Sequence, residues 1–313
     1  MIKIGNLSCK KGEKINGFWN IDDYTIPVTI INGKKEGKIV AISAGIHNCE
    51  YTGIQTAIEL SNEIDIENIK GVLIILHTVN YSGFFKKLSE ILPEDNKNLN
   101  RVFPGNNKGT ISDKIAFNFS NILYPKLDFF IDLHGGDVFE DVMPFIYAPG
   151  IGDNEIIEKS HDVAKIIDVP YRVKSKSSTG AYNSAAIQGI PSILLEKGGK
   201  GIWSIDDVIE YKNYMKNALR YLEVLDDKEE LKINESQKEI IEVKYINSEY
   251  DAYWYPKFTP GDLIKKGDLL GELKDCFGET IKEFKGEFDG VILYQTVSLA
   301  TFIGNPLIAY GKI

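Results

Sequence analysis

The sequence predicts an α/β domain with a largely parallel, buried sheet, followed by a small all-β domain. Short apolar runs bounded by glycines and polar turns alternate with helical patterns over the first 225 residues, as is typical of strands buried on both faces. A charged stretch low in aromatic residues, 226–247, then reads as a surface connection. We place the domain boundary near Glu235, which gives domains 1–235 and 236–313.

The first forty residues carry glycines among β-branched residues and predict a short antiparallel entry to the sheet. Apolar runs between turn residues then predict five strands, at 38–43, 71–77, 127–133, 144–147 and 192–196. Apolar residues at helical spacing predict five helices, at about 50–63, 112–123, 154–167, 179–188 and 205–225. The alternation of the two patterns favours parallel strands joined by helices.

Residues 240–313 predict a small β-sandwich or barrel without helices, because regularly placed glycines separate short alternating strands. The pattern PGDLIKKGDLLGEL, followed by EFDGVILY, also resembles biotinyl or lipoyl carrier domains. The turn that would carry the modified lysine has Asp289 and Gly290 instead. We therefore expect this domain to act as a lid over a site or as an oligomerisation module.

Composition excludes several classes of protein. The chain has 36 basic and 45 acidic residues, a net charge of −9, so no polyanionic partner such as nucleic acid is expected. Its three cysteines are far apart and lack CxxC spacing, which argues against a disulfide framework and against a thiolate metal site. No apolar stretch is long enough to cross a bilayer. We expect a soluble cytoplasmic protein without a membrane partner.

Four residues with ligand or acid–base chemistry follow predicted strands. His47 and Glu50 stand three apart in AGIHNCEYTG, His134 ends the apolar run FFIDLH, and Glu196 ends SILLE. In open α/β sheets, sites form beyond the carboxyl ends of strands, where these side chains would converge. Two histidines and a carboxylate are a ligand set for catalytic zinc with water in the open position.

We therefore predict one zinc ion per chain on His47, Glu50 and His134. Glu196 is then the candidate general base, which takes a proton from the zinc-held water as it attacks a carbonyl and passes it to the leaving amine. Asp132, two residues before His134, is expected to support the site rather than bind the metal.

Arg101 is one of only three arginines in the chain and follows Asn100 in the segment NKNLNRVFPG. A planar guanidinium beside an amide suits two-point capture of a substrate carboxylate. An ordinary buried ion pair is an equal alternative for Arg101.

Four ordered motifs, GIHNCEYTG, NLNRVFPG, FIDLHGG and GIPSILLEKGG, resemble the succinylglutamate desuccinylase and aspartoacylase family of zinc-dependent N-acyl amino acid amidohydrolases. The resemblance covers about residues 38–225, and the glycine-rich tail is similar to the small β domain of that family. It implies a three-layer α/β/α domain like that of the zinc carboxypeptidases. It also implies zinc on His47, Glu50 and His134, Glu196 as base, and a substrate carboxylate on Asn100 and Arg101.

The chain departs from the family pattern at two places. Asn48 stands where glycine usually follows the first ligand histidine; if this position has positive φ, asparagine is the best substitute. An additional arginine that helps polarise the scissile carbonyl usually precedes the NLNR segment, and here FFKKLSEILPEDNKNLNR has none. Lys86 or Lys87 could take its place, or the zinc could act alone.

The predicted function is hydrolysis of the amide bond of a small N-acyl amino acid or related amine. A metallocarboxypeptidase acting on peptides is one alternative, and a zinc-binding relative without catalysis is another, given the missing arginine. His77 is expected to be a hydrogen-bonded residue at a strand end, and His161 to lie on the surface. No GxSxG motif supports a serine nucleophile.

Overall fold

The computed structural model describes residues 1–313. Its helices are α1 (Tyr51–Glu63), α2 (Tyr81–Lys86), α3 (Ile111–Asn118), α4 (Asn154–Ile166), α5 (Ala181–Ile187) and α6 (Ile205–Tyr221). Its strands are β1 (Ile2–Ile4), β2 (Leu7–Cys9), β3 (Glu13–Ile21), β4 (Tyr24–Asn32), β5 (Lys35–Ala44), β6 (Lys70–Leu76), β7 (Ile91–Leu92), β8 (Lys97–Asn98), β9 (Phe129–His134), β10 (Glu140–Val142), β11 (Phe145–Pro149), β12 (Tyr171–Ser175), β13 (Ser192–Glu196), β14 (Lys238–Ile240), β15 (Val243–Asn247), β16 (Ala252–Pro256), β17 (Leu263–Ile264), β18 (Leu269–Lys274), β19 (Thr280–Lys285), β20 (Gly290–Thr296), β21 (Ala300–Thr301) and β22 (Pro306–Lys312).

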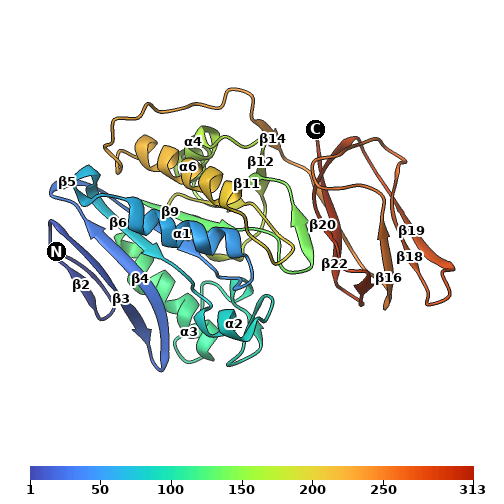
Figure 1. The fold of residues 1–313 in the computed structure, drawn as a ribbon, viewed down its shortest axis with the longest axis horizontal. Helices are drawn as coiled ribbons and strands as arrows, with labels where there is room; N and C mark the ends of the chain where they lie inside the picture. The colour runs from blue at the N-terminus through green and yellow to red at the C-terminus, as the bar shows by residue number, and fades with distance from the viewer.

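A nine-stranded sheet organises the first part of the chain, in the order β14-β12-β11-β13-β9-β5-β6-β4-β3. Five neighbouring pairs are parallel and three are antiparallel, so the sheet is mixed and mostly parallel as predicted. The antiparallel hairpin β3–β4 forms the entry expected from the first forty residues. Helices α1, α4 and α6 cover one face, with α3 on the other, which gives three α/β/α layers (Figure 1).

Two apolar cores fill the spaces between these layers. The core beneath α1, α4 and α6 contains 30 buried residues, and the core on the α3 and α5 side contains 29. The central strands β5, β6 and β9 alternate their side chains between the two, which explains why they read as continuous apolar runs. Because both faces are packed, the register is fixed, and the ends of β5, β9 and β13 stay aligned at one edge.

All five predicted strands are present, with ends shifted by up to three residues. The predicted helix 112–123 is α3 followed by a π-helical segment, Phe119–Leu123. The structure adds elements that the sequence reading lacked. Among them are β12 within the large sheet and the short helix α2.

The C-terminal part consists of two sheets with no helix. One has the order β10-β20-β22-β15, with β17 beside β20, and the other has the order β19-β18-β16-β21. A core of nine buried residues, including Trp254 and Tyr310, joins the two sheets. The large sheet extends past residue 235 to β14, and β10 from the first part pairs with β20 of the second. The connection between the two parts is therefore a shared set of strands rather than a linker alone.

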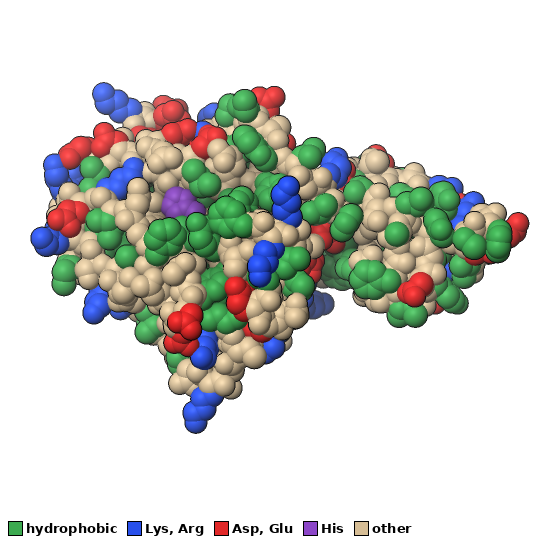
Figure 2. Space-filling view, turned by 60° about the horizontal axis from the view of Figure 1, so that its bottom comes forward, with side chains coloured by type: hydrophobic (Ala, Val, Ile, Leu, Met, Phe, Trp, Pro, Cys, Tyr) green, Lys and Arg blue, Asp and Glu red, His purple; other side chains and the backbone are tan.

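The two parts form a large and a small lobe (Figure 2). The C-terminal sheets make up the small lobe, beside the edge of the large sheet at β11, β12 and β14 (Figure 1). None of the helices combines the length and apolar character needed to span a bilayer.

Candidate metal and active site

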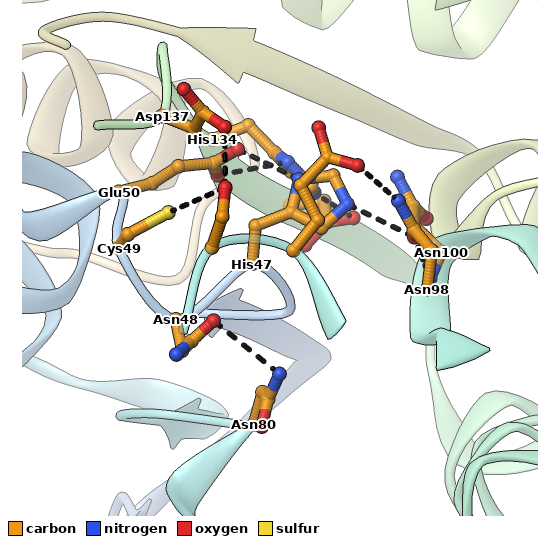
Figure 3. A network of polar contacts seen from close by, with 12 residues as sticks. His47, Asn48, Cys49, Glu50, Asn80, Asn98, Asn100, His134 and Asp137 are labelled. Carbon is orange, nitrogen blue, oxygen red and sulfur yellow. Dashed lines mark hydrogen bonds and ion pairs between the residues drawn. The ribbon is translucent and has the colours of Figure 1, made fainter. Parts of the chain in front are cut away.

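Three side chains with metal-binding chemistry converge at the carboxyl edge of the large sheet. His47 lies in the loop after β5, Glu50 immediately precedes α1, and His134 is the last residue of β9. One ligand atom from each lies within 4.8 Å of the others. Glu50 bridges the histidines: its Oε1 is 2.7 Å from Nδ1 of His47 and its Oε2 is 3.0 Å from Nδ1 of His134 (Figure 3).

Polar contacts on the far side of each imidazole orient its Nδ1 toward this centre. Nε2 of His134 lies 3.1 Å from Oδ2 of Asp132, and Ser43 donates a hydrogen bond of 2.5 Å to the other carboxylate oxygen. Nε2 of His47 lies 3.2 Å from Oδ1 of Asn98. Because both partner atoms are acceptors, each Nε2 carries a proton, and each Nδ1 is the nitrogen that would bind a metal at the centre of the cluster.

The donor set fits a divalent cation. Oε2 of Glu50 is buried, and the only polar side-chain atom in contact with it is Nδ1 of His134, at 3.0 Å. Burial works to lower the pKa of His134, but Glu50 and Asp132 together raise it well above its usual value. Burial likewise opposes charge on Glu50, yet the two histidines hold its pKa near 2. The cluster thus attracts positive charge at its centre, which a proton or a metal can supply.

The loop that carries His47 and Glu50 is fixed by a glycine and an asparagine. Gly45 has a φ of +66°, and a Cβ there would lie 3.0 Å from Ile54. Asn48 donates a 2.7 Å hydrogen bond to the carbonyl of Leu88. Asn48 does not have a positive φ, so the condition under which asparagine would replace glycine there does not arise, and the left-handed position of the loop is Gly45. Asn48 instead ties this loop to the segment after α2.

Glycine pairs after β9 and β13 allow the two loops to pack together. A Cβ on Gly135 would lie 2.4 Å from the carbonyl oxygen of Lys197, and one on Gly198 would lie 2.3 Å from Oγ1 of Thr52. The amide of Gly136 donates to the carbonyl of Gly198. This close approach keeps the ends of the two strands side by side.

Glu196 stands next to His134, because β13 and β9 pair in parallel with these two residues in register. Its carboxylate forms no hydrogen bond or ion pair within the protein and lines the same cavity as the three candidate ligands. Burial, together with the nearby carboxylate of Glu50, raises the pKa of Glu196 to about 8, against the opposing effect of His134. A carboxyl group in this state can accept and release a proton near neutral pH.

Asn100 and Arg101 lie in a single helical turn on another wall of the cavity. Asn100 is only 6% exposed, and its Oδ1 accepts from the amide of Ala181 at 2.9 Å, while its amide nitrogen has no hydrogen-bond partner in the protein. Arg172 and Arg220 pair with carboxylates, but Arg101 is exposed and forms no ion pair. The buried ion pair considered for Arg101 is therefore absent.

The candidate ligands and Glu196 open onto a cavity of about 480 Å³. Sequence reasoning missed several of its lining residues. The carboxylates of Glu90 and Glu140, the phenols of Tyr147, Tyr245 and Tyr294, and Pro306 all contribute. Tyr245 belongs to β15, and its hydroxyl lies 3.0 Å from that of Tyr147. No local motif could have identified Tyr245 or Tyr294, because both reach the cavity through the contact between the two lobes.

Other expectations at single residues had mixed outcomes. Lys86 and Lys87 are exposed and do not line the cavity, so neither replaces the missing arginine there. His77 is hydrogen-bonded to Thr29 at 2.7 Å, as expected of a strand-end residue. The expectation for His161 is wrong: it is 7% exposed and accepts a 2.9 Å hydrogen bond from Nε of Arg172.

The chain is similar to known proteins in both sequence and fold. The model of the succinylglutamate desuccinylase/aspartoacylase catalytic domain matches residues 36–222, more than half of the chain. The N-alpha-acetyl-L-2,4-diaminobutyric acid deacetylase of Halomonas elongata is 25% identical over 297 residues, which cover 92% of this chain and 86% of that protein.

Two solved structures have the same fold over 98% of both chains. The product-bound ectoine utilization protein of Ruegeria pomeroyi superposes with a TM-score of 0.88 at 24% identity. A succinylglutamate desuccinylase/aspartoacylase of Rhodobacter sphaeroides gives 0.85 at 19% identity. With the family model matching the segment that carries all four motifs, the chain belongs to the succinylglutamate desuccinylase/aspartoacylase family.

Proposed function

We propose that this chain is a zinc-dependent deacylase that hydrolyses the amide bond of a small N-acyl amino acid. One observation carries the proposal: an oriented His47–Glu50–His134 cluster faces the same cavity as the unpaired carboxylate of Glu196. Two histidines and one carboxylate leave an open position for catalysis, whereas structural zinc sites are closed by four protein ligands. Membership of a deacylase family supports this reading.

The metal and Glu196 have separate roles. When bound, zinc supplies a Lewis acid that polarises the acyl carbonyl and lowers the pKa of water. Glu196 takes the proton from the attacking water and delivers it to the nitrogen of the leaving amine.

Asn100 and Arg101 would bind the α-carboxylate of the amino-acid part. The partnerless amide nitrogen of Asn100 and the unpaired guanidinium of Arg101 are adjacent donors at one side of the cavity. A carboxylate held there at two points would fix the orientation of the acyl group relative to the metal.

A small acyl group is favoured by the relative from Halomonas elongata, whose name describes removal of an acetyl group from an amino acid.

The C-terminal lobe would act as a fixed cover that limits substrate length, because Tyr245, Asn247, Tyr294 and Pro306 line the cavity from that side. In this proposal residues 236–313 form the covering domain. They are joined to residues 1–235 by the pairing of β10 with β20 and of β14 with β12.

The test is the variant Glu196→Gln, assayed on zinc-loaded protein with a panel of N-acetyl amino acids and, separately, dipeptides. The variant should keep zinc and lose at least about 100-fold in kcat, as expected for removal of a general base. Glu158→Gln, an exposed change on α4, is the matched control and should be as active as wild type. A fully active Glu196→Gln enzyme would refute the assigned role, and activity on dipeptides alone would identify a carboxypeptidase.

A further inference from the structure

We propose that Glu140 and Glu90 make this cavity selective for N-acyl amino acids whose side chain carries a positive charge. The inference rests on the proposed deacylase function and deepens it. Both residues line the cavity of the candidate active site and neither belongs to the four sequence motifs.

Neither carboxylate is neutralised by a basic side chain of the protein. The side chain of Glu140 forms no hydrogen bond or ion pair, and its neighbour on β10, Asp141, holds the nearby Lys200 instead. Glu90 accepts a 2.7 Å hydrogen bond from Nδ2 of Asn98, which leaves its charge in place. Burial and the nearby carboxylates of Asp137 and Glu90 raise the pKa of Glu140 to about 8. No basic side chain of the protein offsets this effect in this part of the cavity.

The acidic lining of the cavity distinguishes the candidate substrates. Four carboxyl groups line it, from Glu50, Glu90, Glu140 and Glu196, against one guanidinium, that of Arg101. Glu50 belongs to the candidate metal centre and Glu196 is the candidate base, which leaves Glu90 and Glu140 without a partner of opposite charge. An ammonium group on the substrate would stabilise the ionised form of either carboxyl group and pair with it. A side chain such as that of aspartate or glutamate would instead bring a like charge to a site of low dielectric constant.

A second feature of the same cavity suits an anionic group. The amide nitrogen of Asn100 belongs to a side chain that is 6% exposed, and it donates to no protein atom. Asn100 lies next to the unpaired Arg101, so this wall of the cavity is suited to bind a negatively charged group of a ligand. Together with Glu90 and Glu140, these donors fit a ligand that carries both a carboxylate and a cation.

Binding of deacylated products to zinc-loaded protein tests this inference without turnover. L-2,4-diaminobutyrate and L-norvaline differ only in an ammonium group against a methyl group, and L-glutamate supplies the acidic case. Calorimetry should give a Kd for diaminobutyrate at least about 30-fold lower than for norvaline, with glutamate the weakest. Equal Kd values for diaminobutyrate and norvaline, or no binding of either, would overturn the inference.

Substitutions then assign the selectivity to residues. Glu140→Gln should weaken diaminobutyrate binding at least tenfold and change norvaline binding less than threefold. Glu90→Gln should act in the same direction, since glutamine still offers an oxygen to Asn98. Asp141→Asn removes a charge from the same strand, outside the cavity lining, and should leave both affinities unchanged. If Glu140→Gln weakens both ligands equally, its role is not selectivity.

Turnover of the three N-acetylated compounds separates this inference from the deacylase proposal. Hydrolysis that favours the acetylated diaminobutyrate by kcat/KM agrees with both. Hydrolysis of all three at similar rates supports the deacylase and rejects the selectivity. Selective binding of diaminobutyrate with no hydrolysis of any of them supports the selectivity and rejects the deacylase.

Discussion

At the residue scale, the candidate metal centre depends on groups that do not touch the metal. Asp132 and Asn98 hold the outer nitrogens of the two histidines, and Ser43 in turn holds Asp132. A strand period of two directs Asp132 and His134 to the same face of β9, which lets them meet. The orientation of the His134 imidazole therefore depends on β5 and β9 lying side by side, since this pairing places Ser43 opposite Asp132.

Asp132→Asn should weaken zinc binding 10- to 100-fold, because a neutral amide raises the basicity of His134 less than a carboxylate does. Competition with a chromophoric chelator measures the affinity. Asp162→Asn, an exposed change on α4, serves as the control. Unchanged affinity in Asp132→Asn would mean that the charge of Asp132 does not strengthen binding of the metal by His134.

His77 should make stability depend on pH below neutrality. Burial lowers its pKa from 6.5 to about 4, so between these values the unfolded chain binds the proton and the folded chain does not. Stability therefore falls as the pH drops through this window. Between pH 7.5 and pH 5, wild type should lose about 2 kcal/mol more than His77→Gln, measured by urea unfolding. Equal losses in the two proteins would contradict the low pKa.

The four candidate residues His47, Glu50, His134 and Glu196 were predictable because each lies at the carboxyl end of a strand or in the loop after it, close to a glycine. Glu90, Glu140 and the tyrosines were not, since a residue's distance from the metal cannot be read from its own segment. His161 was misjudged for a related reason. It is polar in sequence, but the hydrogen bond that it accepts from Arg172 allows both residues to be buried.

At the element scale, the site depends on how α1 packs on β9. Gly53 lies in the first turn of α1, three residues after Glu50, and a Cβ there would be 3.2 Å from Cβ of Leu133 and 3.3 Å from its carbonyl oxygen. This contact brings the start of the helix close to the strand end that carries His134. The sequence predicted both elements, but the need for glycine at their contact is a tertiary constraint.

Gly53→Val should therefore lower zinc affinity at least tenfold, because the added side chain pushes Glu50 away from His134. It should also lower Tm, since the branched side chain crowds a buried contact. Chelator competition and thermal unfolding measure the two effects. Gln55→Val adds a β-branched residue to the partly exposed face of the same helix and should retain zinc. Normal zinc affinity in Gly53→Val would show that the first turn of α1 can shift to accommodate the side chain without moving Glu50.

At the scale of the whole molecule, the cavity belongs to both lobes. The pairing of β10 with β20 joins them, and β15 and β22 supply residues to the cavity wall. The sequence predicted an α/β part followed by a β-rich part, because each has its own pattern. It did not predict that β14 extends the large sheet or that β10 joins the C-terminal one, since pairing between distant short strands leaves no local periodicity.

The central claim is a single catalytic zinc on His47, Glu50 and His134, and metal content tests it most directly. Elemental analysis of wild type and His134→Ala, purified side by side and incubated with zinc, gives zinc per chain. The account predicts close to one zinc in wild type and little in the variant. No zinc in wild type, or equal zinc in both proteins, would contradict it.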